Sequence, residues 1–255
     1  MNYQKLVELI KKQKSFLCVG LDPDTQFVSV DKIYDFNRKI IDQTRDYAVA
    51  YKPNIAFYEH LGPKGWDILY HTMNYIDDHF FTIADAKRGD IGNTGQFYAK
   101  TFFQTYDFDS VTINPYMGKD SISPFLVYPN KYSIILALTS NKGSEDFQTP
   151  DMYKQVLEKC KSWGTIDNTM FVVGATKAES LREIRKIVPD NFLLVPGVGQ
   201  QGGSLDEVCR FGINKNCGLL INSSRGIIYS DNPKREAQKL QQEMEVWLNK
   251  IGLIK

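Results

Sequence analysis

One segment of the chain joins a short apolar run to a cluster of charges: Phe80-Phe81-Thr82-Ile83-Ala84-Asp85-Ala86-Lys87-Arg88-Gly89-Asp90. Residues 80–84 have the length and the β-prone composition of a buried strand. Two carboxylates and two cations follow within six residues, so they gather at the carboxyl end of that strand. Ionisable groups this close shift one another's pKa, which makes the segment a candidate for proton chemistry. The alternative is a solvated strand-to-helix turn, with Asp90 near a helix start.

The length and composition favour one large α/β domain. The 255 residues are 42% hydrophobic, and α/β barrels run to about 250 residues as a single domain, so we expect one domain over residues 1–255. The formal net charge of +1 leaves no basic surplus that would attract nucleic acid or an anionic membrane.

The sequence also predicts where in the cell the protein works and whether it binds a metal. Residues 1–10 have the pattern of an amphipathic helix rather than of a signal peptide, and no stretch of about 20 apolar residues occurs. The four cysteines show neither a CxxC motif nor a spacing with histidine that suits a metal, which is typical of reduced thiols. The sequence therefore predicts a soluble cytoplasmic protein without a bound metal.

Eight short apolar runs alternate with helical patterns along the chain. This is the count of a (β/α)8 TIM barrel, which is the predicted fold. A doubly wound open sheet is the alternative, but no glycine-rich GxGxxG turn follows the first run. The runs are residues 16–21, 47–51, 80–84, 110–113, 133–138, 170–173, 192–195 and 218–221; the helical patterns are residues 32–46, 65–77, 95–105, 153–163, 178–187, 205–211 and 234–248.

Polar or charged side chains follow almost every run at its carboxyl end. In a barrel these ends meet at one rim, where the active site lies, so we treat the residues as one set. In chain order they are Asp22, Lys52, Asp85, Lys87, Asp90, Asn114, residues 139–143, residues 196–203 and Arg225. Each alone has a structural alternative: Asp22 could cap a turn, and Lys52 could extend to solvent along its apolar stem.

The loops after the seventh and eighth runs predict a phosphate site. Residues 196–203 are Pro-Gly-Val-Gly-Gln-Gln-Gly-Gly, and glycine lets backbone N–H groups approach an oxyanion closely. Barrels often bind phosphate with these two loops, and a guanidinium matches phosphate geometry. Gln201 with its loop and Arg225 therefore form a predicted phosphate clamp. The alternative is a flexible turn beside a surface arginine.

Taken in order, these motifs resemble those of the orotidine 5′-phosphate decarboxylase family over nearly the whole chain. Residues 52–54 (Lys-Pro-Asn) and 114–118 (Asn-Pro-Tyr-Met-Gly) resemble the longer bacterial branch of that family. The signature Asp-x-Lys-x-x-Asp-Ile-x-x-Thr is met by Asp85, Lys87, Asp90, Ile91 and Thr94, the first- and second-strand positions by Asp22 and Lys52, the phosphate loop by residues 196–203 and the last-strand arginine by Arg225.

The resemblance implies a carboxy-lyase that converts orotidine 5′-monophosphate to UMP and CO2, the last step of de novo UMP biosynthesis. It implies neither a metal nor an organic cofactor. It also implies a homodimer with active sites at the interface, in which Asp90, Ile91 and Thr94 reach the partner's site.

The resemblance also implies a role for each site residue. Lys87 protonates C6 of the pyrimidine, Asp85 lies beside the departing carboxylate, and Lys52 and Asp90 complete an alternating Lys–Asp–Lys–Asp network. Substrate-binding positions are Asp22 at the ribose, Ile91 and Thr94 from the partner, Ser140 at the pyrimidine amide, and Pro196, Gly199, Gln201 and Arg225 at the phosphate end.

Some positions leave alternatives open. Ser223-Ser224 precedes Arg225 where many relatives have Val-Gly, so the backbone there departs from the family pattern. Ser140 is chosen over the neighbouring Thr139 at the pyrimidine. Asn54 and Asn114 are either ligand contacts or turn caps, and Arg88 is interpreted as a structural or surface cation.

Two rival functions remain. A Mg²⁺-dependent sugar-phosphate decarboxylase or synthase of the same barrel group shares the Asp-x-Lys-x-x-Asp pattern, but Lys52 stands where another acidic ligand would serve a metal better. A non-catalytic protein that binds a nucleotide phosphate is the second rival, although binding alone does not require Lys87 among carboxylates.

Overall fold

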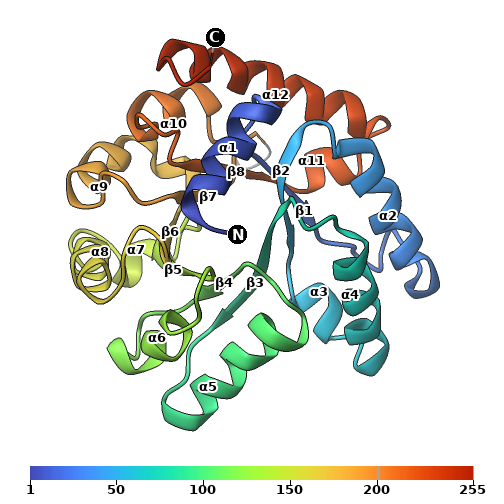
Figure 1. Ribbon diagram of the computed structural model, residues 1–255, viewed down its shortest axis with the longest axis horizontal. Coiled ribbons are helices and arrows are strands. Elements are labelled where there is room, and N and C mark those ends of the chain that lie inside the picture. Colours follow the sequence, from blue (N-terminus) through green and yellow to red (C-terminus); the bar gives the residue numbers. More distant parts are fainter. Residues whose placement is uncertain (200–201, 255) are drawn as a thin grey trace.

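Eight parallel strands close into a barrel in the computed structural model, which describes residues 1–199 and 202–254 (Figure 1). Each strand pairs with the next, and β8 pairs back with β1. The strands are β1 (Leu17–Leu21), β2 (Ala48–Pro53), β3 (Phe81–Arg88), β4 (Ser110–Ile113), β5 (Tyr132–Leu138), β6 (Thr169–Val173), β7 (Leu193–Pro196) and β8 (Leu219–Ser223). The predicted (β/α)8 barrel is confirmed, and the open sheet is excluded.

Helices surround the barrel on its outside (Figure 1). The α-helices are α1 (Tyr3–Gln13), α2 (Ile33–Thr44), α3 (Ala56–Glu59), α4 (Pro63–Tyr75), α5 (Gly92–Lys100), α6 (Lys119–Leu126), α7 (Ser144–Phe147), α8 (Met152–Trp163), α9 (Leu181–Ile187), α10 (Leu205–Gly212), α11 (Arg225–Ile228) and α12 (Pro233–Lys250). Short 3-10 segments are η1 (Val30–Lys32) and η3 (Ala175–Ser180), and η2 (Thr101–Thr105) is a π-helical turn.

Each predicted run overlaps one strand, but several boundaries differ. β3 continues to Arg88, whereas the sequence predicted an end at residue 84, because the apolar run stops there while the backbone pairing resumes at Arg88 after a register shift. The predicted helix 95–105 is α5 followed by η2, and the first part of the predicted helix 178–187 belongs to η3. Helix α6 was not predicted, since Pro124 lies inside it and interrupts the pattern.

The core lies where the strands meet the helices, and one end of the barrel is covered. Strands β1 and β6 are buried at every residue, as expected of parallel strands covered on both faces. Helix α1 lies across the amino ends of the strands (Figure 1), where the Tyr3 hydroxyl donates to the Asp190 carbonyl just before β7. The opposite, carboxyl ends remain accessible. Among the described residues, no helix has the length and apolarity needed to cross a bilayer.

Candidate active site

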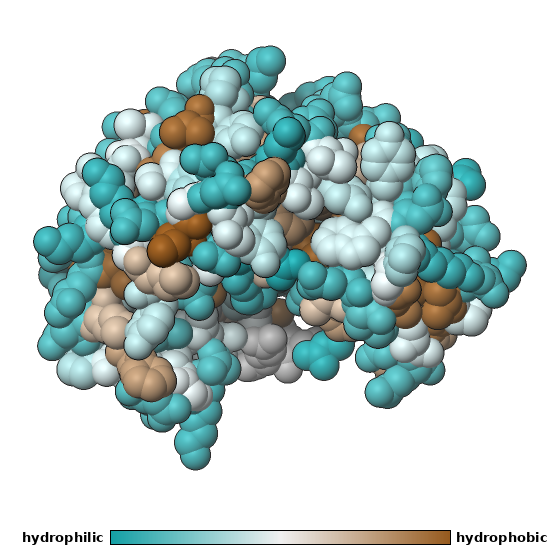
Figure 2. Space-filling view, turned by 90° about the horizontal axis from the view of Figure 1, so that it is seen from below, coloured by the Kyte–Doolittle hydropathy of each residue, from teal (hydrophilic) through white to brown (hydrophobic). Residues whose placement is uncertain are grey.

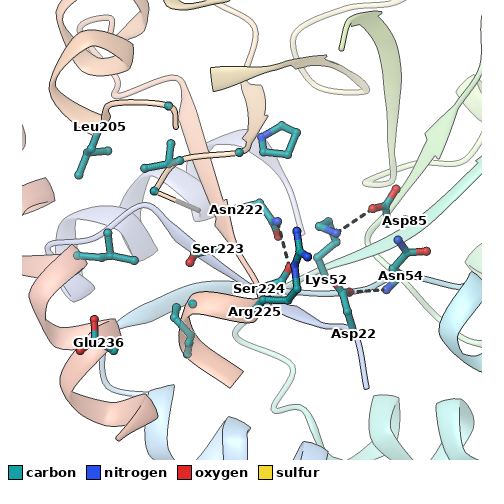
Figure 3. Close-up of a pocket in the computed structure, with 18 of the residues that line it drawn as sticks. Asp22, Lys52, Asn54, Asp85, Leu205, Asn222, Ser223, Ser224, Arg225 and Glu236 are labelled. Carbon is teal, nitrogen blue, oxygen red and sulfur yellow. Dashed lines mark hydrogen bonds and ion pairs between the residues drawn. The ribbon is translucent and has the colours of Figure 1, made fainter. Parts of the chain in front are cut away.

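Asp85 lies between two lysines at the carboxyl end of the barrel. Its Oδ2 is 2.8 Å from Nζ of Lys52 on β2, and its Oδ1 is 2.5 Å from Nζ of Lys87 on the same strand. Figure 3 shows the Lys52 side chain pointing at the Asp85 carboxylate. The Lys52 side chain is 4% exposed and the Lys87 side chain 49% exposed. The Lys52 ammonium is therefore buried in the barrel, while the Lys87 side chain reaches the solvent side.

The charges of Asp85 and Lys52 hold each other ionised. Burial alone would raise the pKa of Asp85, but the ammonium groups of Lys52 and Lys87 outweigh it and keep that pKa well below the usual carboxyl range. Burial alone would likewise lower the pKa of Lys52, but the attraction of Asp85 and then Asp22 raises that pKa above the usual lysine range. At neutral pH the cluster thus presents a buried carboxylate flanked by cations.

A bulge in β3 directs Lys87, and the neighbouring strand supports it. The backbone of Lys87 has φ 49°, a left-handed conformation that costs a non-glycine residue on the order of 1 kcal/mol. Thr112 of β4 stabilises it: the Lys87 amide donates to Thr112 Oγ1 at 2.9 Å, and Thr112 Oγ1 lies 3.2 Å from Asp85 Oδ1. Thr112 was not predicted, although its polar side chain in the middle of an apolar run was a signal.

A cavity of about 730 Å³ opens beside this cluster (Figure 3). Its size suits a small ligand. Lys87 is not part of the lining but contacts Asp85, which is. The lining brings together predicted residues from distant parts of the chain: Asp22, Lys52, Asn54, Asp85, Pro196, Gly199 and Arg225.

The glycine-rich loop after β7 is held by bonds within itself. Gly197, Gly199 and Gly202 have positive φ values of 96°, 79° and 85°, which glycine adopts without strain. The amides of Gly199, Gly202 and Gly203 donate to carbonyls of the same loop at 2.9–3.1 Å. The sequence predicted that the amides of this loop would bind an oxyanion. These three amides are instead bonded within the loop, so fewer of its N–H groups remain for a ligand. Gln201 lies outside the described residues.

Arg225 begins α11 and lines the same cavity. Its side chain is exposed, and among the described residues no hydrogen-bond or ion-pair partner engages its guanidinium. Ser224 directly before it accepts a hydrogen bond from Asn222 Nδ2 at 3.3 Å, and any Cβ on Gly20 would lie 1.8 Å from Ser224 Oγ. Gly20 thus leaves the room that the Ser-Ser departure from the family pattern requires.

The segment after β3 lies apart from the charged cluster of its own chain. The Asp90 carboxylate accepts from the next amide, that of Ile91, at 2.7 Å. Ile91, which precedes α5, is 48% exposed, and Thr94 in the first turn of α5 is exposed as well. Three members of the predicted network, Lys52, Asp85 and Lys87, are therefore joined within one chain, and Asp90 is not.

Thr139 and Ser140 differ in how they are engaged. The amide of Thr139 donates to Gln148 Oε1 at 2.7 Å, and its hydroxyl is 3.0 Å from Gln148 Nε2. Ser140 follows at the end of β5, and Gly174 packs so closely on it that an added Cβ would lie 2.6 Å from Ser140 Cα. Gln148 thus holds both the amide and the hydroxyl of Thr139.

The chain is similar to known proteins over nearly its whole length. Residues 15–240 match the profile of the Orotidine 5'-phosphate decarboxylase / HUMPS family. The chain belongs to this family. A relative from Flavobacterium johnsoniae, named orotidine 5'-phosphate decarboxylase, is 56% identical over 96% of this chain and 97% of its own.

Solved structures of the family agree with the fold. The OMP decarboxylase of Leishmania donovani superposes with a TM-score of 0.89 at 36% identity, covering 97% of this chain and 99% of its own. UMP synthase from the same organism gives a TM-score of 0.91 at 37% identity; the match covers 97% of this chain but only 56% of that longer one.

Three residues left open by the sequence have structural roles here. Asn54 Oδ1 accepts from the Ala56 amide at 3.2 Å and Asn114 Oδ1 from the Tyr116 amide at 3.0 Å, so both cap turns, although Asn54 also lines the cavity. Arg88 bonds Glu59 at 2.7 Å and stacks over the ring of Tyr98, which fixes the end of β3 against α3 and α5.

We predict that Asp85→Asn makes stability pH-dependent. Without the Asp85 charge, burial lowers the pKa of Lys52 below its unfolded value of about 10.4, so the unfolded state binds more protons at intermediate pH. The variant is then less stable by about 3 kcal/mol near pH 6 and gains stability as pH rises toward 10. The wild type gains no stability over this range, because its Lys52 pKa is raised. The difference in the free energy of unfolding between the two proteins, measured with urea, should therefore narrow as pH rises.

The matched control is Asp151→Asn, which removes an exposed carboxylate 3.2 Å from Lys154. Its stability should follow the wild type at every pH. A gap between Asp85→Asn and wild type that stays constant from pH 6 to 10 would show that Lys52 does not depend on Asp85.

Proposed function

We propose that the protein decarboxylates orotidine 5′-monophosphate to UMP and CO2. The observation that carries this proposal is the ionised Asp85 between a buried Lys52 and a half-exposed Lys87, beside a cavity that Arg225 also lines. Membership of the family and the shared name of the full-length relatives support the same reaction.

The chemistry requires a site that stabilises a carbanion and then protonates it. Breaking the C6–carboxylate bond leaves the electron pair on C6, where the pyrimidine ring delocalises it poorly. Lys87 stabilises that charge with its ammonium and then transfers a proton from Nζ to C6. Its exposure makes it the available acid, whereas Lys52 is buried and already bound to Asp85. The balance is one substrate and one proton giving UMP and CO2.

Asp85 acts on the substrate's own carboxylate. Because its pKa is held low, it stays ionised when the substrate binds, and like charges in proximity raise the energy of the bound carboxylate. Loss of CO2 relieves that repulsion, so the effect favours the transition state over the ground state. The same carboxylate holds the Lys87 ammonium in an ion pair, and Thr112 holds both residues in place.

The remaining cavity binds the rest of the nucleotide. Arg225 and the loop after β7, which includes Pro196 and Gly199, receive the phosphate, and Asp22 receives the ribose. Ser140 binds the pyrimidine amide. Phosphate binding far from C6 supplies remote binding energy that positions the reacting atoms.

The two rival functions are less well supported. A Mg²⁺ ion at Asp85 would lie beside two ammonium groups, whose repulsion opposes a divalent cation. A protein that only binds a nucleotide would not need Lys87 in a strained conformation next to Asp85.

We further propose a homodimer in which Asp90, Ile91 and Thr94 complete the partner's site. A groove of about 890 Å³ between α5 and α6 adjoins this segment, and hydrophobic side chains stand exposed around it. Figure 2 views the molecule from the side of α5 and shows hydrophobic side chains among polar ones on this face. The exposed hydrophobic residues that line the groove are Ile91, Phe97 and Val127. Such a cluster is typical of a protein interface.

The four cysteines are free and buried, which is consistent with the cytoplasmic location that the sequence predicts.

Purified protein should consume orotidine 5′-monophosphate in the presence of EDTA. The reaction needs no metal, because Lys87 supplies the proton and the cation that the carbanion requires. The measurement is the loss of ultraviolet absorbance of the substrate, with UMP identified by chromatography. Activity that vanishes with EDTA and returns with Mg²⁺ would favour the metal-dependent rival.

Lys87→Ala should lower kcat by at least about 1000-fold, since it removes both the acid and the stabilising ammonium. The affinity for UMP, measured by calorimetry, should remain detectable because Asp22 and Arg225 are unchanged. Lys186→Ala, at a side chain 72% exposed on α9, is the matched control and should retain full turnover. Retained turnover in Lys87→Ala would remove Lys87 from its role.

Mixing Lys87→Ala with Asp90→Ala should restore activity that neither variant has alone. In a mixed dimer, one site lacks both side chains and the other takes intact Lys87 and Asp90 from different chains. Random exchange makes about half of the dimers mixed, so the mixture should reach about a quarter of wild-type activity. An inactive mixture, with subunit exchange verified by mass spectrometry, would place Asp90 in its own chain's site.

A further inference from the structure

Asp22 lies just beyond the sheet, where backbone pairing no longer holds it. The ladder between β1 and β2 ends with Leu21 opposite Pro53, and the pairing between β1 and β8 already ends at Val19. Proline has no amide hydrogen to extend a ladder. The next amide of β2's continuation, that of Asn54, donates to the Asp22 carboxylate at 3.3 Å. The direction of this carboxylate therefore needs other supports.

Tyr58 of α3 supplies the first support. Its hydroxyl donates to the Leu21 carbonyl at 2.9 Å and accepts from Asn37 Nδ2 at 3.0 Å. The tyrosine is fully buried. Because Asn37 donates to the hydroxyl oxygen, the hydroxyl proton is directed to Leu21.

Tyr229, which follows α11, supplies the second support. Its hydroxyl donates to the Asp22 carbonyl at 3.1 Å and accepts from the Asp24 amide at 2.6 Å. The ring stacks on Phe36 at 5.7 Å between centroids, and the exposed Phe27 covers it at 5.0 Å. One phenol thus closes the turn around Pro23, which has no amide hydrogen of its own.

We propose that Tyr58 and Tyr229 are positioning residues that together set the direction of the Asp22 side chain. The carbonyls of Leu21 and Asp22 belong to the two peptide planes that flank the Asp22 Cα. Holding both planes fixes φ and ψ of Asp22, and with them the direction of its Cα–Cβ bond. The inference rests on the proposed function, in which Asp22 binds the ribose.

Tyr229 also ties Asp22 to the phosphate end of the cavity. It lies one helical turn after Arg225, and its amide donates to the Arg225 carbonyl at 3.3 Å. The segment that carries the phosphate-binding cation therefore also carries the hydroxyl that holds Asp22. This fixes the distance between the ribose contact and the phosphate contact, a spacing that a nucleoside phosphate must match.

The decisive variant is Tyr229→Phe, which removes one oxygen and keeps the ring packing. We expect kcat/KM for orotidine 5′-monophosphate to fall on the order of 10-fold, since two hydrogen bonds to the Asp22 turn are lost. Tyr132→Phe is the matched control: Tyr132 is fully buried, and its hydroxyl has no hydrogen-bond partner among the described residues. It should leave kcat/KM unchanged.

A double-mutant cycle separates positioning of Asp22 from a general loss of structure. Tyr229→Phe should cost no more than about twofold in the background of Asp22→Ala, because the group it positions is already absent. In the background of Ser140→Ala its full cost should persist. Tyr58→Phe should behave in the same way, and it replaces Tyr229→Phe if thermal melting shows that variant unfolded at the assay temperature.

The outcomes distinguish this proposal from the proposed activity. If the wild type turns over the substrate, two results would overturn the positioning role alone. One is a kcat/KM of Tyr229→Phe equal to that of the wild type. The other is the same fold loss of kcat/KM from Tyr229→Phe in the Asp22→Ala background as in the wild type. A wild type that binds UMP without consuming orotidine 5′-monophosphate would overturn the activity. The same cycle, measured in UMP affinity, would then decide the role of Tyr229.

Discussion

The contact between Asp85 and Lys52 is the constraint on which the rest of the site depends. A carboxylate and an ammonium this deeply buried each carry a large desolvation penalty, and neither is tolerated without the other. The closed barrel keeps them in contact because their strands, β2 and β3, pair directly. With Lys52 in place, Asp85 remains ionised and can hold a second cation. Lys87 is this second cation, and its side chain reaches the solvent side while its ammonium stays paired with Asp85.

The barrel needs few polar residues to build this contact, but it restricts where they can stand. Parallel strands that are buried on both faces tolerate a polar side chain only at their carboxyl ends or where a partner satisfies it. Thr112 illustrates the second case, since its hydroxyl meets both the Lys87 amide and the Asp85 carboxylate. The bulge in β3 and the left-handed backbone at Lys87 store local strain, and the hydrogen bond to Thr112 compensates it. A small hydroxyl on the neighbouring strand is therefore as important to the geometry as the charges are.

The fold was predictable because eight apolar runs are a long-range regularity that single residues do not disturb. The charged members of the site were predictable because ionisable side chains at strand ends are rare in a core. The supports were not: Thr112, Tyr58 and Tyr229 act through hydrogen bonds to atoms distant in the chain, and nothing in their local sequence marks those partners. The end of β3 was placed too early because the apolar signal ends before the backbone pairing does. The engaged amides of the loop after β7 depend on positive φ values at its glycines, which composition permits but does not specify.

The exposure of Lys87 has a consequence for the catalytic cycle. In the proposed reaction Lys87 gives its proton to C6, and Asp85 then keeps one ammonium neighbour, that of Lys52. The remaining partner, Lys52, keeps the pKa of Asp85 low, so that carboxylate stays ionised. Because the Lys87 side chain is 49% exposed, solvent can deliver a new proton to it once the product leaves. A fully buried acid would lack this route. The unequal burial of the two lysines thus agrees with the proposed division, in which Lys52 keeps its charge and Lys87 exchanges its proton.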